Sequence, residues 1–190
     1  MQRRRFLQTF LGASFLLVNS DKILTAEKTS GSQEELSADL AVIGGSLGGC
    51  AAALAAARNG QTVILTEESD WIGGQLTSQA VPPDEHPWIE QFGCTRSYRE
   101  LRNSIRQYYL QNYPLTTAAN DAAHLNPGNC GVSRLCHEPA AALFVLESMF
   151  ASYVSSGQVR ILRRTRPVSV DAAHDEIRAI EVEYPASGNR

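Results

Sequence analysis

The chain contains a run of small residues, Gly-Gly-Ser-Leu-Gly-Gly, that begins at Gly44. Such a turn before a helix suits the pyrophosphate of a dinucleotide, because unpaired backbone N–H groups and the helix dipole stabilise negative charge. The first glycine allows a tight turn, the second admits the phosphates and the third lets the helix pack on the strand. Gly44 and Gly49 hold the first and third places. Ser46 holds the second, and its hydroxyl has a proton to donate to phosphate, while Gly45 and Gly48 add room.

The segments around this turn predict a βαβ unit. An apolar run at residues 38–43 indicates a buried parallel strand. The alanine-rich residues 50–59 favour a helix that stops at Gly60. Residues 62–66 are β-branched and predict a second strand. The whole unit fits in about 30 residues, the size expected of a βαβ unit.

Glu67 stands at the end of the second strand. In dinucleotide-binding folds, the acid that binds a ribose hydroxyl lies roughly 20 residues after the glycine turn, and Glu67 is close to that position. Gly73 and Gly74 follow shortly after. The alternative to dinucleotide binding is a purely structural glycine-rich turn in an α/β protein that binds no dinucleotide. The strand before the turn, the helix after it and the acid favour dinucleotide binding.

Ionisable residues beside prolines are the candidates for acid–base chemistry near a cofactor. They are Asp84, Glu85, His86, Arg96, Arg134 and His137. A solvated loop explains such charges more often than catalysis does. We select His86 and His137 as the candidate catalytic residues, and the acid Glu138 before Pro139 fits the start of a helix.

The four cysteines do not have the regular spacing of a disulfide framework or of a zinc site. They are Cys50, Cys94, Cys130 and Cys136. We expect small buried thiols and no metal. Cys136 also lacks a Cys-x-x-Cys partner that would favour a redox role.

The remaining segments predict two helices, a third strand and a hairpin. Ser97 with Glu100 has the capping-box pattern, and the helix that follows carries Leu101, Ile105 and Tyr108 on one face with Arg99, Arg102 and Arg106 elsewhere. Pro139 suits the first position of a helix that ends at Gly157. Residues 159–162 predict a strand, and residues 167–170 and 177–184 a hairpin with its turn at 171–176.

The N-terminus has the pattern of an export signal. The run Arg3-Arg4-Arg5-Phe6-Leu7 resembles a twin-arginine motif, and the apolar run at 10–18 is too short to span a bilayer. We expect a signal at residues 1–20, a flexible linker at 21–37 and the folded domain at 38–190, with localisation in the periplasm or cell envelope. A basic amphipathic anchor is the alternative.

Composition excludes several classes of protein. The net charge of −3 gives no reason to expect nucleic acid as a partner. Lysine occurs only at Lys22 and Lys28, so the folded part has neither a P-loop lysine nor a Schiff-base lysine. The expected partners are the export machinery and a small-molecule substrate.

The run 39–44, the alanine-rich helix, Glu67 and then Gly73-Gly74-Gln75 resemble the flavoprotein superfamily that includes fumarate reductases and glutathione-reductase-like enzymes. The bacterial FAD-dependent oxidoreductase family within it is the most similar. The segments 71–79, 82–86 and 135–139 also resemble that family. The resemblance implies an α/β, Rossmann-like FAD/NAD(P)-binding domain, with a parallel sheet and a β-hairpin excursion.

The resemblance also implies a set of FAD contacts. Gly44, Gly45, Ser46, Leu47, Gly48 and Gly49 are expected to line the pyrophosphate, and Glu67 to bind the adenosine ribose. Gly73, Gly74 and Gln75 are expected near the pyrophosphate and ribityl chain, Thr77 and Ser78 near the flavin, and Val168 near the adenine.

Relatives of this kind are longer and close the FAD site with a late Gly-Asp strand. We therefore expect an incomplete domain, an N-terminal fragment of such an enzyme. Three hypotheses follow: an FAD-dependent oxidoreductase, a non-catalytic remnant that does not hold FAD alone, and an NAD-binding module. The third is the least favoured, because Gly73-Gly74 after Glu67 indicates FAD rather than NAD.

Overall fold

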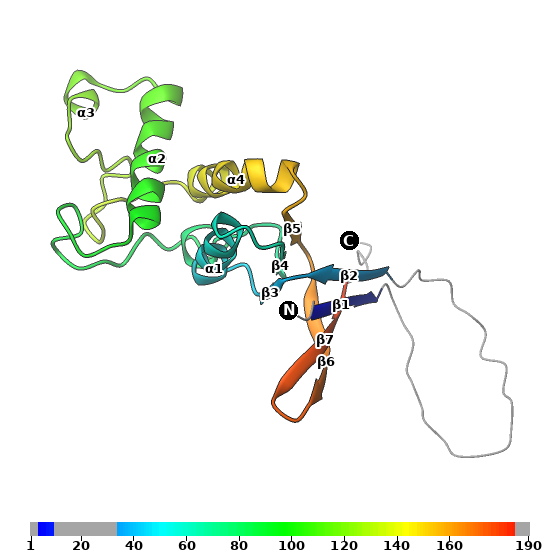
Figure 1. Ribbon diagram of the computed structural model, residues 1–190. Helices are drawn as coiled ribbons and strands as arrows, with labels where there is room; N and C mark the ends of the chain where they lie inside the picture. The colour runs from blue at the N-terminus through cyan, green and yellow to red at the C-terminus, as the bar shows by residue number, and fades with distance from the viewer. Residues whose placement is uncertain (1–3, 10–33, 185–190) are drawn as a thin grey trace, which may run out of the picture.

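The computed structural model describes residues 4–9 and 34–184, which form an α/β domain with two sheets (Figure 1). The first sheet is parallel, in the order β3-β4-β5. Its strands are Leu40–Ile43, Val63–Thr66 and Val159–Leu162. The predicted Rossmann-like α/β fold, with a parallel sheet and a β-hairpin, is confirmed.

The central strand β4 is buried on both faces, as its β-branched sequence predicts. Val63 and Leu65 pack into the cluster beneath the helices, whereas Ile64 belongs to a second cluster on the opposite face. This alternation is the two-residue period of a strand. The sheet is therefore the centre of a layered domain, with helices on one face and the second sheet against the other.

Helix α1, Leu47–Arg58, connects β3 to β4. It begins three residues earlier than residue 50, because Ser46 caps it and the glycines continue into its first turn. Helix α4, Pro139–Ser155, begins at the proline as predicted, and Gly157 follows it with a φ of 74°. A left-handed glycine is a common helix terminator.

Helix α2, Arg96–Asn112, is capped by Thr95 and not by Ser97. The Thr95 hydroxyl oxygen accepts a hydrogen bond from the Tyr98 N–H at 3.2 Å. The Ser97 hydroxyl oxygen instead accepts from Arg58, a residue of α1. The predicted capping box is therefore wrong, because a tertiary contact engages its serine. A short helix, α3, spans Thr117–Asn120, and a 3₁₀ turn, η1, spans Gly74–Leu76.

The second sheet has the order β2-β1-β7-β6. Its strands are Glu34–Ala38, Arg4–Thr9, Glu176–Glu183 and Arg166–Ala173, in the same order. The predicted hairpin forms, but Ala173 pairs with Glu176, so its turn is shorter than residues 171–176. His174 in that turn adopts a φ of 58°.

Strand β2 corrects the predicted linker at residues 21–37. Its residues 34–37 are part of a sheet, because Leu36 and Ala38 are buried against Ile64 and Val182. Strand β1 lies within the predicted signal and pairs with β2 and β7. The rest of that signal, and the linker up to residue 33, lie outside the described residues, so the export prediction stays a prediction.

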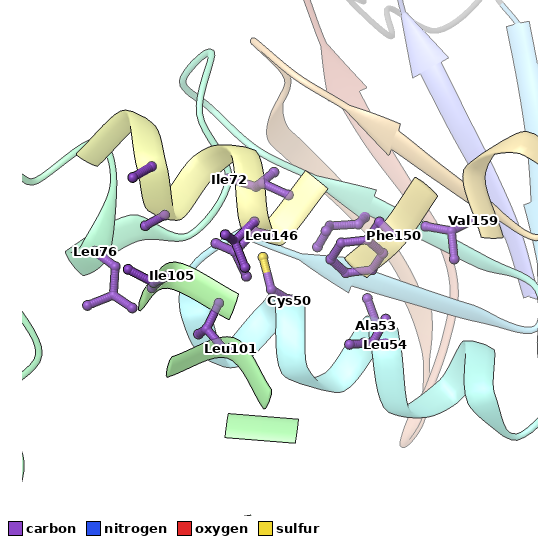
Figure 2. Close-up of a cluster of buried hydrophobic side chains, with 14 of the residues drawn as sticks. Cys50, Ala53, Leu54, Ile72, Leu76, Leu101, Ile105, Leu146, Phe150 and Val159 are labelled. Carbon is purple, nitrogen blue, oxygen red and sulfur yellow. The ribbon is translucent and has the colours of Figure 1, made fainter. Parts of the chain in front are cut away.

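The main core joins α1, α2, α4 and the parallel sheet (Figure 2). Phe150 and Leu146 of α4 pack against α1, where Ala53 is fully buried. Small alanines on α1 let the two helices approach each other and the sheet closely. This packing holds the start of α1 at the end of β3, where the glycine turn lies.

Two arginines of α2 are buried, although the helical pattern of the sequence places them away from the apolar face. Arg102 is 1% exposed and Arg106 6%. They pair with Glu85 and Glu90 of the preceding loop, which the helical period does not reveal. Among the described residues, no helix has both the length and the apolar character that crossing a membrane requires.

Candidate functional site

The glycine turn begins directly after β3, and its tightness depends on two glycines. Gly44 adopts a φ of 100°, a conformation that L side chains rarely take, and its N–H donates to the Thr66 hydroxyl oxygen at 3.1 Å. A Cβ atom on Gly49 would lie 2.0 Å from the Gly44 carbonyl oxygen. The predicted roles of the first and third glycines therefore match the geometry.

Ser46 is the N-cap of α1, and its hydroxyl oxygen accepts from the Gly49 N–H at 3.3 Å. That bond leaves the hydroxyl proton available to a ligand oxygen. Leu47 and Gly48 begin the helix, where backbone N–H groups have no acceptor within the helix itself. The first turn contains no acidic residue. This end of α1 is thus electrostatically suited to an anionic group.

Gly73 and Gly74 lie against the glycine turn, although they are far from it in sequence. The Gly73 N–H donates to the Gly45 carbonyl at 2.7 Å, and Gly73 forms an isolated parallel β-bridge with Ser46. A Cβ atom on Gly74 would lie 3.2 Å from the Cα of Ser46. The structure therefore brings together the two glycine segments that are expected to contact one cofactor.

Glu67 follows β4, and its two carboxylate oxygens have different surroundings. Oε1 accepts from the backbone N–H and the hydroxyl of Ser69, at 2.8 and 2.7 Å. Oε2 lies beside Gly45, where an added Cβ atom would be only 2.7 Å from it. One oxygen is held in place and the other faces the glycine turn.

Together these features fit the adenosine diphosphate half of FAD. The turn and the α1 N-terminus offer N–H donors to a pyrophosphate, and Glu67 offers an acceptor to a ribose hydroxyl. Side chains larger than hydrogen at Gly45 and Gly74 would occupy the space between these elements. The residues present therefore fit the cofactor.

Gln75, Thr77 and Ser78 lie along the segment that follows Gly74. Thr77 is 1% exposed, and its hydroxyl donates to the Ile72 carbonyl at 2.7 Å, so this side chain stabilises the turn. Gln75 donates through its side chain to the Pro82 carbonyl at 3.3 Å. Ser78 is exposed and, like Thr77, lines a cavity of about 650 Å³ that reaches the start of α4.

Val168 lies on β6, in the four-stranded sheet, and is 47% exposed. Three residues earlier, the Thr165 N–H donates to the Glu67 carbonyl at 2.8 Å. The chain therefore passes Glu67 shortly before it reaches Val168. No contact of Val168 with the glycine turn is seen among the described residues.

The two candidate catalytic histidines lie in different surroundings. His86 lines a cavity of about 510 Å³. Neither His137 nor any residue of the glycine turn lines that cavity. His137 precedes α4, and burial lowers its imidazole pKa, which favours the neutral ring. Its Nε2 atom is buried without a hydrogen-bond partner among the described residues. The structure does not unite the two in one site.

Three contributors to the geometry were not predicted. Thr66 and Ser69 hold Gly44 and Glu67, and only their positions beside predicted site residues give a signal in the sequence. Cys130 and Cys136 form a disulfide, which corrects the expectation of free thiols. Their separation of six residues allows such a bond when the loop folds back, and here the Cα atoms are 5.9 Å apart.

The fold and the site define a dinucleotide-binding α/β domain. The model of a family described as FAD dependent oxidoreductase matches residues 39–189, and the chain belongs to this family. FAD is therefore the cofactor expected of it. No curated protein matches the chain.

Among solved structures, the chain is similar to Sdh1 of Mycobacterium smegmatis, determined in complex with UQ1. The two are 16% identical, with a TM-score of 0.41. The alignment covers 77% of this chain and 32% of that one, so the chain spans about a third of the length of that structure.

Proposed function

We propose that this chain is the FAD-binding part of an oxidoreductase that acts on a small-molecule substrate. The observation that carries the proposal is the meeting of three segments at Gly45. Its carbonyl accepts from Gly73, a Cβ on it would touch Glu67, and it directly precedes the Ser46 cap of α1. Membership of an FAD dependent oxidoreductase family supports the same cofactor.

FAD, when bound, supplies the redox chemistry, and the protein supplies binding and orientation. The N–H groups of Leu47 and Gly48, with the Ser46 hydroxyl, donate hydrogen bonds to the pyrophosphate. Oε2 of Glu67 accepts a hydrogen bond from a ribose hydroxyl, while Ser69 prevents the carboxylate from rotating away. Ser78 is exposed on the segment beyond Gly74, at the cavity where a substrate is proposed to approach.

Titration of the purified chain with FAD, followed by flavin fluorescence, tests the proposal. Glu67→Ala removes the ribose acceptor, and loss of a hydrogen bond to a charged group predicts roughly 10-fold weaker binding or more. Gly45→Ala is expected to weaken binding as well, because its Cβ would displace the Glu67 carboxylate.

Gly131→Ala is the matched control, because a Cβ there meets no atom within 4 Å. Unaltered affinity in Glu67→Ala would contradict the assigned site. Absence of FAD binding to the wild-type chain, or tight binding of NAD without FAD, would contradict the proposed function.

A further inference from the structure

A second cavity, of about 510 Å³, lies between the segment 83–90 and the loop 124–134. No residue of the glycine turn lines it. Its volume is within the range of about 300–1,000 Å³ that is usual for small-molecule sites. We call it the 83–134 cavity, and it is separate from the proposed FAD site.

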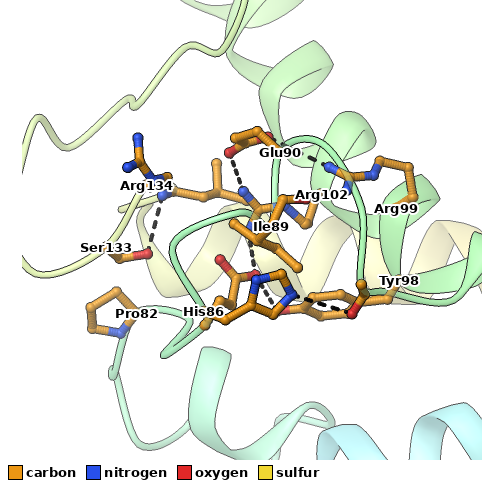
Figure 3. A network of polar contacts seen from close by, with 12 residues as sticks. Pro82, His86, Ile89, Glu90, Tyr98, Arg99, Arg102, Ser133 and Arg134 are labelled. Carbon is orange, nitrogen blue, oxygen red and sulfur yellow. Dashed lines mark hydrogen bonds and ion pairs between the residues drawn. The ribbon is translucent and has the colours of Figure 1, made fainter.

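One wall of the cavity is rigid because buried ion pairs support it (Figure 3). Glu85 and Glu90 line the cavity, and their side chains are only 8% and 9% exposed. Arg102, 1% exposed, pairs with both carboxylates, and Arg106 pairs with Glu90. Burying this many charges is costly unless each is paired, so the wall has little freedom to rearrange.

The charges around the cavity are not balanced. Behind the wall, Arg99, Arg102 and Arg106, which do not line the cavity themselves, pair with the two glutamates, and this network carries a surplus of one positive charge. Both oxygens of Glu90 accept from arginines, and Oε1 of Glu85 accepts from Arg102 and Tyr98. Glu90 is thus neutralised within the wall, whereas Oε2 of Glu85 is buried there without a hydrogen-bond partner among the described residues.

Arg134 adds a second positive charge on the opposite wall, and its backbone is held at several points. Its carbonyl accepts from Arg106 at 3.4 Å, and the disulfide between Cys130 and Cys136 closes the loop that carries it. Asn126 donates to the carbonyls of Cys130 and Ser133, both at 3.1 Å. The loop is therefore a fixed base for the Arg134 side chain.

The Arg134 guanidinium itself is available. It is exposed, and it makes no ion pair among the described residues. Figure 3 shows it pointing away from the Glu90 carboxylate. Beside it, the Ser133 hydroxyl oxygen accepts from the Leu135 N–H at 3.1 Å, so its proton is free to be donated. Asp84, the nearest acid in sequence to Glu85, does not line the cavity.

We propose that the 83–134 cavity binds an anionic small molecule, whose carboxylate or phosphate group pairs with Arg134 and accepts from Ser133. A guanidinium binds either group through two parallel hydrogen bonds. The cavity is larger than a single oxyanion needs, so the rest of the ligand occupies the space in front of Glu85 and His86.

Calorimetric titration of the intact chain at low ionic strength tests this proposal. The probes are malonate, inorganic phosphate and the neutral isostere malonamide. Saturable binding of malonate or phosphate is expected, with no binding of malonamide and with weakening as salt is added. The tighter of the two anions identifies the group. Failure of both anions to bind, or equal binding of malonamide, overturns the proposal.

Arg134→Gln is expected to weaken the bound anion roughly 10-fold or more, because the charge-assisted pair is lost. Arg178→Gln makes the same charge change on the exposed face of β7 and is expected to leave affinity unchanged. Ser133→Ala, a smaller change, is expected to weaken binding to a lesser extent.

Equal losses in Arg134→Gln and Arg178→Gln would show a non-specific charge effect and overturn the assignment. FAD affinity of Arg134→Gln should match the wild type, since no residue of the glycine turn lines the 83–134 cavity. A failure here is therefore distinct from a failure of the proposed FAD site.

Discussion

Gly48 and Gly49 are neighbours in the first turn of α1, but only one of them has a steric need to be glycine. A Cβ atom on Gly48 would make only an ordinary contact, 3.8 Å from the Ser46 hydroxyl oxygen. A Cβ on Gly49 would lie 2.0 Å from the Gly44 carbonyl oxygen, well inside any permitted contact. The close approach of helix to strand therefore depends on Gly49.

Gly49→Ala is expected to destabilise the fold by about 1–3 kcal/mol, the usual range for overpacking. Gly48→Ala is the matched control, and alanine's higher helix propensity predicts no loss or a gain of up to about 1 kcal/mol. Urea unfolding followed by circular dichroism measures both. Equal stability of the two variants would contradict the close packing of α1 on β3.

Cys50 shows how burial changes a single thiol. It is 2% exposed and donates to the Gly45 carbonyl at 3.4 Å. Burial raises its pKa from 9.0 to about 12, because the thiolate is poorly solvated there. The folded state thus retains a proton that the unfolded state loses above pH 9.0.

Stability should therefore fall as pH rises above 9.0, by about 1.4 kcal/mol per pH unit from this group. The variant Cys50→Ala is expected to lack that part of the alkaline loss, while it keeps the losses from other groups. Urea unfolding at several pH values between neutral and alkaline compares the slopes. Parallel slopes for the two proteins would rule out the protonated buried thiol.

At the scale of the single element, helix α2 is unusual because its buried face contains arginines as well as apolar side chains. Its buried face includes Leu101 and Ile105, as the pattern predicts, but also Arg102 and Arg106. Those two arginines hold the segment that carries Glu85 and Glu90 against the helix. The ion pairs therefore connect α2 to a loop that has little regular structure of its own.

Arg102→Met is expected to cost about 3–5 kcal/mol, because it leaves Glu85 buried without its arginine partner and removes one of the arginines that pair with Glu90. Arg58→Met removes the exposed pair with Glu100 and should cost no more than about 1 kcal/mol. Thermal and urea unfolding compare the two. Similar small losses would mean that the buried network is solvated in solution.

The network also predicts an acid dependence. Burial alone would raise the pKa of Glu90, but hydrogen bonds and charge from Arg106 and Arg102 outweigh it and lower the pKa below 4.5. A lowered carboxyl pKa gives stability that is present above the unfolded pKa and lost as pH falls through the folded value. The cost of Arg102→Met should therefore shrink as the pH falls below 4.5 and Glu90 takes up a proton.

At the scale of the whole molecule, the sequence of the N-terminus bears on where the protein is localised. We propose export by the twin-arginine route, because residues 3–7 have its pattern. The disulfide between Cys130 and Cys136 supports an oxidising compartment, since such bonds persist mainly outside the cytosol.

The double variant Arg3→Lys with Arg4→Lys is expected to keep the protein in the cytoplasm. Arg5→Lys is the matched control, since the third position of the motif is variable, and it should be exported normally. Cell fractionation and immunoblotting measure the distribution. Continued export of the double variant would exclude the twin-arginine route.

Much of the site was predictable because its signals are local. The glycine turn, Glu67 and Gly73-Gly74 are read from short spacings, and β5 and the start of α4 fall at the expected residues. The cap of α2 was not predictable in this way. Ser97 has the right pattern, but Arg58 of another helix engages its hydroxyl, so Thr95 caps the helix instead.

The sequence by itself determined the βαβ unit, its glycine turn and the acid that follows, because backbone preferences and periodicity act over a few residues. Only the tertiary structure decided that Gly45 lies between Glu67 and Gly73, that Arg102 is buried, and that Cys130 pairs with Cys136. Those outcomes depend on contacts between distant segments. Such contacts form only when the helices and sheets pack, and no local pattern specifies which partner a side chain will meet.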